Sequence, residues 1–521
     1  MRGMSDDLEE IMIRERMKKR RLSENQNEEI YENEDRLSDL PDCVILHILS
    51  FLNTKHVVRT CVLSTRWKHL WKRIPTLILH SSRFSTLKKF TVFVHKILTL
   101  RDTSSALHAL DLDRRGNIEP QLLKKILNYV CSHNNHLSKL GISVRGDSSF
   151  ILSCVSSCRA LTSLQLSIYP RGNDFTETLF PKSLNLPLLT SLDLTNFAFD
   201  GGETGCAEPF LVFTKLNSLV ICSCKVKDAS TLRISSETLV NLAIDSPLKK
   251  ISFVVQHNLF NIVMIELSTP NLCTFKFTGD LVQKICGSGL SSVKQVNIYS
   301  RDFSALAEHA LVLRSWLLDF ANVESLTVTS TVLQILSLVP DLLEVKLSLC
   351  YLKSMEIELI PIYDISLLLL IKEAMLKKAA AKSRKEVAML RKAFKARLEP
   401  PAIPDGIVDF LRQNSPSAEV KITTDYSSNF NLKQIEESIK GAKIIKYRPR
   451  FAAPASPAAS ASSSEFASNA SPASATEPAS AAPPNLHLCR TEKDDKSSNE
   501  DKVEKHQLST SRHWVVKEFS Y

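Results

Sequence analysis

Two pairs of cysteines are spaced closely enough to suggest metal-binding chemistry. Cys154 and Cys158 share one short segment, and Cys222 and Cys224 share another. Structural zinc sites combine two such pairs, or one pair with histidines at matching spacing. No second pair with complementary histidines follows either of them, and the 12 cysteines are scattered along 521 residues. We therefore expect reduced thiols in a hydrophobic core, with no metal, no cofactor and no disulfide framework.

The other chemistry-bearing residues form no recognisable catalytic motif. The sequence has no glycine-rich phosphate loop, no Gly-x-Ser-x-Gly elbow and no His-Glu-x-x-His segment, and only 13 glycines in all. His133 and His136 lie near Cys131, but they follow an amphipathic pattern that ends at Val130 and predicts a helix. We therefore expect these histidines in a loop, and a protein that is not an enzyme.

The net positive charge is concentrated in one segment near the C-terminus. Lys and Arg (66) exceed Asp and Glu (56) by 10, and residues 372–397 hold ten basic and two acidic side chains, a net +8. Apolar residues recur there at helical spacing, so we expect one basic amphipathic helix that ends at Pro400 and Pro401. Such a helix suits RNA, an acidic membrane surface or an acidic partner. The expected arrangement is a solvated helix that packs one face on the preceding domain, so nucleic acid is not an expected partner.

The two ends of the chain have the composition of disordered segments. Residues 1–34 carry seven basic and ten acidic side chains, and residues 451–484 contain 13 alanines, nine serines and six prolines. The basic cluster Lys18, Lys19, Arg20 and Arg21 fits either a nuclear import signal or the charged face of a fraying helix. No stretch is long enough to span a membrane, and the acidic start does not resemble a secretory signal. We expect the protein in the nucleus, the cytoplasm or both.

Residues 35–75 predict three short helices in close succession. Pro41 suits a first helical turn, Thr54 can cap a second helix and Ser64 a third. About 40 residues are too few for an independent core, so part of the apolar surface needs cover from another chain or from the next domain. The apolar residues of helical period are Val44, Ile45, Ile48, Leu49 and Leu52, then Val57, Val58 and Val62, then Trp67, Leu70 and Trp71.

This module resembles an F-box of the plant type. Residues 35–42 read Asp-Arg-Leu-Ser-Asp-Leu-Pro-Asp, and residues 62–67 read Val-Leu-Ser-Thr-Arg-Trp. The resemblance implies docking on a Skp-type adaptor, which connects the chain to a cullin and a RING subunit. The implied adaptor contacts are Leu40, Pro41, Ile45, Ile48, Leu49, Leu52, Val62, Leu63, Trp67, Leu70 and Trp71. The residues alone leave open which of these side chains build the module's own core.

Residues 105–350 contain an irregular repeat with large apolar residues at i, i+3 and i+5. The mean spacing of about 26 residues falls in the leucine-rich repeat range. Each copy predicts one short strand that stacks on the next, because no copy can bury its apolar face alone. The central positions are Leu110, Leu140, Leu164, Leu192, Leu219, Leu242, Phe275, Val296, Leu326 and Val345.

The strands of such an array present outward-facing residues between the buried ones. A curved sheet surface of this kind suits the binding of another protein. The mixed chemistry of these positions identifies no ligand, and plain solvent exposure is the favoured explanation for any single one of them. The candidate facing residues are Gln165, Asp193, Lys276, Asn297, Thr327 and Lys346.

The order of the two modules resembles the plant F-box/LRR-repeat proteins, whose repeats capture a target for ubiquitylation. Many members end in a further small domain, the FBD, and residues 351–450 occupy that place without its usual tryptophan-cysteine pattern. The hormone receptors of the family seat an inositol phosphate in their repeats, and no clustered arginines for a polyphosphate occur in this array. A hormone-receptor role is therefore not expected.

The sequence thus predicts an α+β protein with five parts. These are a disordered arm (1–34), a three-helix F-box (35–80), an irregular α/β leucine-rich-repeat solenoid (81–350), a basic helix with a small α/β cap (351–450) and a disordered tail (451–521). The expected function is substrate recognition in an SCF-type ubiquitin ligase, with an unidentified protein target on the repeats. The alternative is a non-degradative scaffold or nucleic-acid-associated protein that uses the repeats and the basic helix 372–397.

Overall fold

The computed structural model describes the chain from residue 39 to residue 446 with gaps. The predicted arm 1–34, the start of the F-box motif at 35–38 and the predicted tail 451–521 lie outside the described residues. The described ranges are 39–169, 178–202, 205–245, 264–279, 281, 284–300, 307–339, 342, 349–362, 365–396, 399–426, 429–439 and 443–446.

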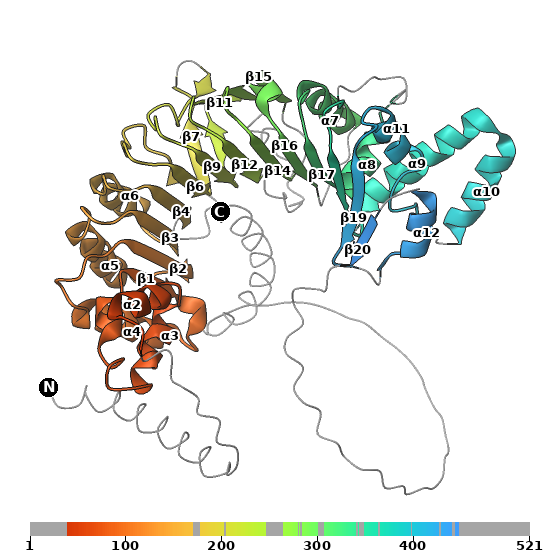
Figure 1. The fold of residues 1–521 in the computed structure, drawn as a ribbon. Coiled ribbons are helices and arrows are strands. Elements are labelled where there is room, and N and C mark those ends of the chain that lie inside the picture. The colour runs from red at the N-terminus through yellow and green to blue at the C-terminus, as the bar shows by residue number, and fades with distance from the viewer. Residues whose placement is uncertain are drawn as a thin grey trace, which may run out of the picture. The chain divides into compact units, whose positions relative to one another are not determined.

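One parallel sheet runs through the described part of the chain (Figure 1). It contains 13 strands, and each pairs in parallel with its neighbours. In spatial order the strands are β1 (Thr76–His80), β2 (Ala109–Asn117), β3 (Lys139–Arg145), β4 (Ser163–Tyr169), β6 (Ser191–Thr195), β9 (Ser218–Cys222), β12 (Asn241–Asp245), β14 (Thr274–Thr278), β16 (Gln295–Tyr299), β17 (Ser325–Thr329), β18 (Ser354–Glu358), β19 (Glu419–Thr424) and β20 (Lys443–Lys446).

The predicted repeat centres align across this sheet. Leu110 pairs with Leu140, and the register continues through every predicted centre to Leu326 on β17. These side chains are at most 2% exposed, because they occupy the buried face of the sheet. Nine of the ten centres are thereby confirmed, and the tenth, Val345, lies outside the described residues.

The parallel sheet extends beyond the predicted repeat array (81–350) at both ends. The sheet begins with β1, where Leu77 pairs with Leu110, and it continues beyond β17 because Met355 on β18 pairs with Leu326. Val420, predicted in a separate cap, lies on β19 and pairs with Met355. A long insertion separates β18 from β19, so Val420 lies far outside the repeat spacing from Met355 and β19 did not read as a repeat.

Two smaller sheets replace helices in the middle repeats. A three-stranded sheet has the order β10-β7-β5, and a four-stranded sheet has the order β15-β13-β11-β8. They consist of β5 (Thr178–Leu179), β7 (Phe197–Asp200), β8 (Cys206–Ala207), β10 (Lys225–Lys227), β11 (Thr231–Ser235), β13 (Met264–Ser268) and β15 (Lys284–Ser288).

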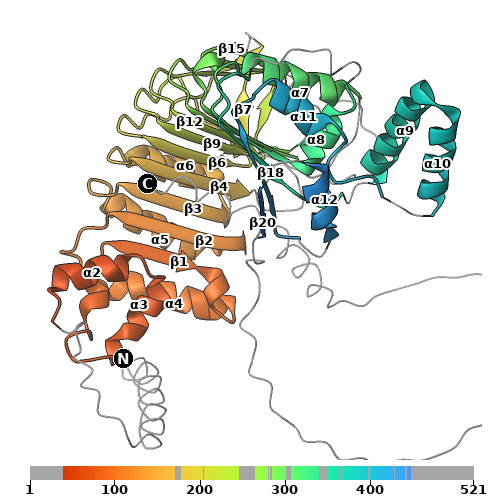
Figure 2. The ribbon, with the colours of Figure 1, turned by 45° about the vertical axis from the view of Figure 1, so that its right-hand side comes forward.

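Helices cover the buried face of the first repeats, with α4, α5 and α6 beside strands β1 to β4 (Figure 2). The predicted amphipathic helix that ends near Val130 is confirmed as α5, whose apolar face is buried. Among the described residues, no helix is both long and apolar enough to cross a membrane. The described α-helices that follow β1 in the chain are α4 (Leu87–Leu100), α5 (Pro120–Ser132), α6 (Ser148–Ser157), α7 (Ala307–Asp319), α8 (Ser330–Leu336), α9 (Ile365–Lys382), α10 (Arg384–Lys395), α11 (Ile407–Gln413) and α12 (Leu432–Ser438). Single 3-10 turns occur at η3 (Ser81–Arg83) and η5 (Leu290–Ser292).

Candidate functional site

The predicted three-helix module has two α-helices and a shorter third element. Pro41 precedes α2 (Asp42–Ser50), and α3 (Thr54–Arg59) runs into a 3-10 turn, η1 (Thr60–Val62). The third helix predicted after Ser64 is only a 3-10 turn, η2 (Leu70–Arg73). No side chain caps η2, so the predicted role of Ser64 as its cap is not realised.

The structure separates the predicted adaptor contacts into buried and exposed side chains. Ile45, Leu49, Trp67 and Leu70 are at most 6% exposed and belong to the hydrophobic core of the repeats. Their side chains pack inside the protein and present no surface to a partner. Leu40 and Trp71 are half-buried against the same core.

The remaining predicted contacts form an apolar surface, which we call the exposed F-box face. Ile48, Leu52, Val62 and Leu63 are 39–53% exposed, and Pro41 is exposed too. Several large apolar side chains exposed within one short module are typical of an interaction site on a soluble protein. Sequence reasoning missed two members, Val44 (38% exposed) and Phe51 (71% exposed), although Val44 stands in the apolar stripe of α2. The exposed F-box face comprises Pro41, Val44, Ile48, Phe51, Leu52, Val62 and Leu63.

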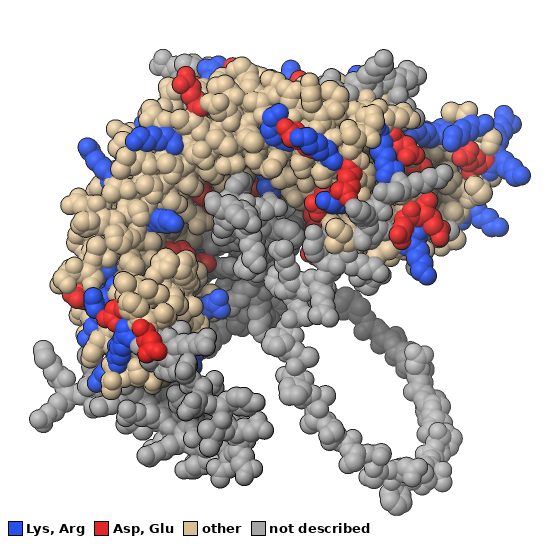
Figure 3. All heavy atoms as spheres, viewed as in Figure 1, with Lys and Arg blue, Asp and Glu red and all other residues tan. Residues whose placement is uncertain are grey.

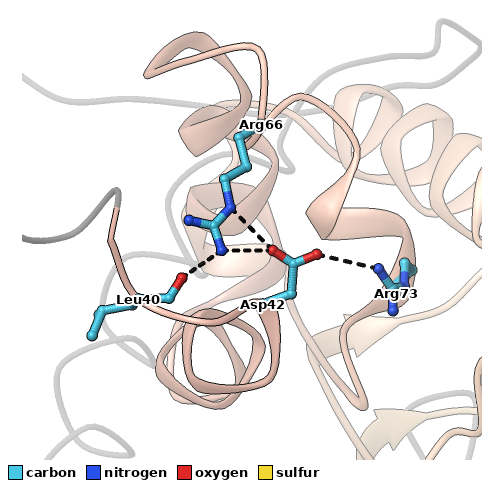
Figure 4. A network of polar contacts seen from close by, with 4 residues as sticks. All are labelled: Leu40, Asp42, Arg66 and Arg73. Carbon is cyan, nitrogen blue, oxygen red and sulfur yellow. Dashed lines mark hydrogen bonds and ion pairs between the residues drawn. The ribbon is translucent and has the colours of Figure 1, made fainter.

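A polar network holds the beginning and the end of the module together (Figure 4). Arg66 donates hydrogen bonds to Asp42 Oδ1 from Nε (3.1 Å) and Nη2 (2.9 Å), and it also donates to the carbonyl oxygen of Leu40. Arg73 Nη1 lies 3.5 Å from Asp42 Oδ2. Asp42 is in the first turn of α2, where a negative charge stabilises a helix. The network therefore fixes α2 against the segment that carries Trp67.

The F-box is joined directly to the first strand of the repeats. Thr54, which is fully buried, does not cap α3; the cap is Asn53, whose Oδ1 accepts from Lys55 N. Instead, Thr54 Oγ1 accepts a hydrogen bond from the backbone N–H of Ile78 on β1 (2.8 Å). The module therefore covers the edge of the sheet, as the capping unit of a repeat array must.

A buried arginine reinforces this joint. Arg101, 4% exposed, follows α4 and donates to the carbonyl oxygens of Ile74, Ser105 and Ala106 and to the hydroxyl of Tyr129 on α5. These four hydrogen bonds satisfy the two terminal nitrogens of the buried guanidinium, whereas Nε is buried without a partner among the described residues. The contacts connect the end of the F-box to the second repeat.

The predicted facing residues that the structure describes lie in one row on the face of the sheet opposite the repeat centres. We call this face the open side, although Ala243 and Lys276 are buried there. Gln165, Asp193, Asn297 and Thr327 occupy equivalent positions of their strands, and Gln165 Nε2 donates to Asp193 Oδ2 (2.9 Å). Lys276 occupies the same row but is only 6% exposed, so its predicted solvent exposure is wrong, and Lys346 lies outside the described residues. The full row is Ile78, Asp111, Gly141, Gln165, Asp193, Val220, Ala243, Lys276, Asn297, Thr327, Glu356 and Lys421.

A titratable pair lies at the F-box end of this surface. His80 Nε2 is 2.8 Å from Asp111 Oδ2. Partial burial lowers the pKa of His80, but the hydrogen bond to Asp111 and the charges of Asp111 and Asp113 outweigh it, so the pKa is raised. The histidine at this end of the row therefore keeps its proton to a higher pH than an ordinary histidine does.

The basic segment is a hairpin of two helices, so the prediction of one continuous helix is wrong. Ser383 separates α9 from α10, and its Oγ accepts a hydrogen bond from Glu386 N at the start of α10. Lys372 Nζ on α9 lies 5.4 Å from the ring centre of Phe394 on α10, so the two helices pack on each other. Figure 3 shows Lys and Arg side chains gathered over this hairpin. Its exposed basic residues are Lys377, Lys378, Lys382, Arg384, Lys385, Arg391, Lys392 and Lys395.

Comparison with known proteins supports the same reading of the N-terminal module. The family model for the F-box domain matches residues 37–79. An FBD-associated F-box protein of Arabidopsis thaliana is 26% identical over 63% of this chain, and an F-box/LRR-repeat protein of the same plant is 27% identical over 58%. A putative FBD-associated F-box protein, also from Arabidopsis thaliana, is 30% identical over 41% of this chain. The matches span 67%, 80% and 44% of these relatives, respectively.

Proposed function

We propose that this chain, an F-box/LRR-repeat protein of the plant type, is the substrate-recognition subunit of an SCF-type ubiquitin ligase. The observation that carries the proposal is the exposed F-box face, whose apolar side chains remain uncovered while Ile45, Leu49 and Trp67 complete the protein's own core. The F-box would bind a Skp-type adaptor, and through it a cullin and a RING subunit.

The repeats would hold the target protein on the open side of the sheet. The chain then acts by raising the effective concentration of a target lysine near the ubiquitin-loaded enzyme, and it supplies no catalytic group itself. The direct joint between the F-box and β1, through Thr54 and Arg101, supports this role because it keeps the target at a defined distance from the adaptor. Such a complex would work in the nucleus, the cytoplasm or both, and imaging of a fluorescently tagged chain tests this location.

Binding of the purified full chain to a Skp-type adaptor tests the proposal. We expect a micromolar or tighter Kd, and we expect Leu63→Asp and Ile48→Asp to weaken it at least about tenfold, because a carboxylate would be desolvated in the interface. The matched control is Val92→Asp, which changes an apolar side chain of similar exposure (46%) on α4, outside the F-box.

Circular dichroism of each variant verifies that the fold is retained. Failure of the folded wild-type chain to bind any Skp-type adaptor would remove the ligase role. Equal binding by wild type and both F-box variants would show that another surface contacts the adaptor.

A further inference from the structure

Two thiols from different repeats lie against each other beneath the F-box end of the sheet. Cys131 is in the last turn of α5 and Cys154 is in the middle of α6, and their Sγ atoms are 3.1 Å apart. The sequence singled out Cys154 and Cys158 as a closely spaced pair and favoured reduced core thiols there; the two lie one helical turn apart. The fold instead brings Cys131 to Cys154 across the contact between two helices.

The two thiols differ in their access to solvent. Cys131 is half-buried, whereas Cys154 is 4% exposed and Cys158 is fully buried. A small oxidant therefore reaches Cys131 first. The pKa of the Cys154 thiol lies far above its ordinary value, because of the neighbouring Cys158 thiol, burial and Cys131. Cys154 is consequently protonated and does not itself attack peroxide, so it gives up its proton only in the step that joins it to oxidised Cys131.

We propose that Cys131 and Cys154 are an oxidation site at which hydrogen peroxide forms a disulfide between α5 and α6. A disulfide bond is about 2.05 Å long, so the two sulfur atoms must approach by only about 1 Å. Intracellular disulfides of this kind are reversible and respond to the redox state of the cell. Neither the adaptor-binding role nor the capture of a target requires this reaction.

The chemistry has two steps. The Cys131 thiolate attacks one oxygen of hydrogen peroxide, the O–O bond breaks, and the released hydroxide takes a proton to become water. Cys131 is then a sulfenic acid. The sulfur of Cys154 attacks the sulfur of Cys131, the S–O bond breaks, and the leaving hydroxide takes the proton of Cys154 as a second water. Two thiols and one peroxide thus give one disulfide and two water molecules.

The cross-link would tie together the two repeats that follow the F-box. It would connect the helices behind β2, β3 and β4, which carry Asp111, Gly141 and Gln165 of the open surface. A cross-link that closes a loop in the unfolded chain stabilises the folded state. Oxidation therefore raises the melting temperature, and a thiol reductant reverses the change.

The experiment uses the full chain, fully reduced and then exposed to hydrogen peroxide. Free thiols are blocked by alkylation, and peptides are mapped by mass spectrometry without reduction. We expect a peptide pair linked through Cys131 and Cys154, lighter by two hydrogen atoms than the separate peptides. Cys131→Ser should abolish it, and Cys158→Ser, the matched control in the same cluster, should retain it.

A sample oxidised in urea shows whether the fold directs the pairing, because the preference for this pair should disappear on unfolding. Two results would overturn the proposal. One is that folded Cys131 proceeds to the sulfinic acid while Cys154 remains open to alkylation after unfolding. The other is that the linked pair forms equally well in urea.

Discussion

Arg66 donates two hydrogen bonds to a single carboxylate oxygen of Asp42, across 24 residues of chain. The same guanidinium binds the backbone of Leu40, so it fixes the exact start of α2. The arginine of the Ser-x-Arg-Trp segment, which the sequence left without a role, is therefore a structural residue that sets the position of the exposed F-box face.

Replacing Arg66 by Lys should lower the stability of the F-box modestly. Lysine keeps the charge but loses the forked geometry that reaches both Asp42 and Leu40. Both partners are partly exposed, so we expect a loss of about 0.5–1 kcal/mol in the free energy of unfolding. Urea unfolding followed by tryptophan fluorescence measures it, since Trp67 and Trp71 lie in this module. A loss of several kcal/mol would mean that solvent screens these ion pairs far less than the exposure of their side chains indicates.

Thr54→Val should weaken the contact between the F-box and strand β1. Valine matches the shape of threonine but cannot accept the hydrogen bond from Ile78 N–H, and an unpaired buried donor costs about 1–3 kcal/mol. Hydrogen exchange at the Ile78 amide should accelerate by the factor that corresponds to this loss of free energy. The control is Thr60→Val, because Thr60 Oγ1 only donates to the carbonyl of Val57 within the module. Equal exchange rates at Ile78 in both variants would contradict the joint described here.

The pair His80 and Asp111 should make stability depend on pH. The pKa of His80 is raised from 6.5 in the folded state, so its stabilising contribution is complete below about pH 6.5 and is lost as the pH rises through the raised pKa. The melting temperature of the wild type should therefore exceed that of His80→Gln most in mildly acidic buffer. A difference that grows from pH 6 to pH 9 would have the wrong sign.

The basic hairpin should be dispensable for adaptor binding. It is inserted between β18 and β19, while the F-box covers β1 at the other end of the strand order. The test variant carries five replacements by Gln and should keep the wild-type Kd for the adaptor within about twofold. If the wild type binds RNA at physiological salt, with a steep salt dependence that this variant lacks, the alternative nucleic-acid-associated function gains support. The replaced residues are Lys377, Lys378, Lys382, Arg384 and Lys385.

The repeat strands could be predicted because their signal is local. Leucine at i, i+3 and i+5 is required wherever a strand stacks on its neighbour, so Leu110 and Leu326 identified their strands without any tertiary information. Met355 was not chosen because the same pattern also occurs ten residues earlier, where Val345 was taken as the centre of this repeat. Leu77 was not recognised as a repeat centre because it closely follows the tryptophans of the F-box and has no earlier repeat to align with.

The candidate site could be predicted as a segment but not as a surface. Ile45 and Leu49 form one helical stripe, and Val44 and Ile48 form the adjacent one, and both are equally apolar. The tertiary packing of α2, which lies against η2, decides which stripe is buried. The roles of Thr54 and Arg101 depend on partners far away in the sequence, and no local pattern distinguishes them from ordinary polar residues.

The F-box and the first repeats share one hydrophobic core. This core sets a lower limit on the length of the segment that can be transferred to another protein. A fragment that ended at residue 80 would keep Leu77 and Leu79 but lose Leu110 and Leu112, the residues with which they pair on β2. It would also lack Arg101, so the carbonyl of Ile74 would lose its donor. The smallest transplantable unit therefore extends through the first repeats, and chimeras that exchange target specificity should be joined after β3, not at the end of the F-box.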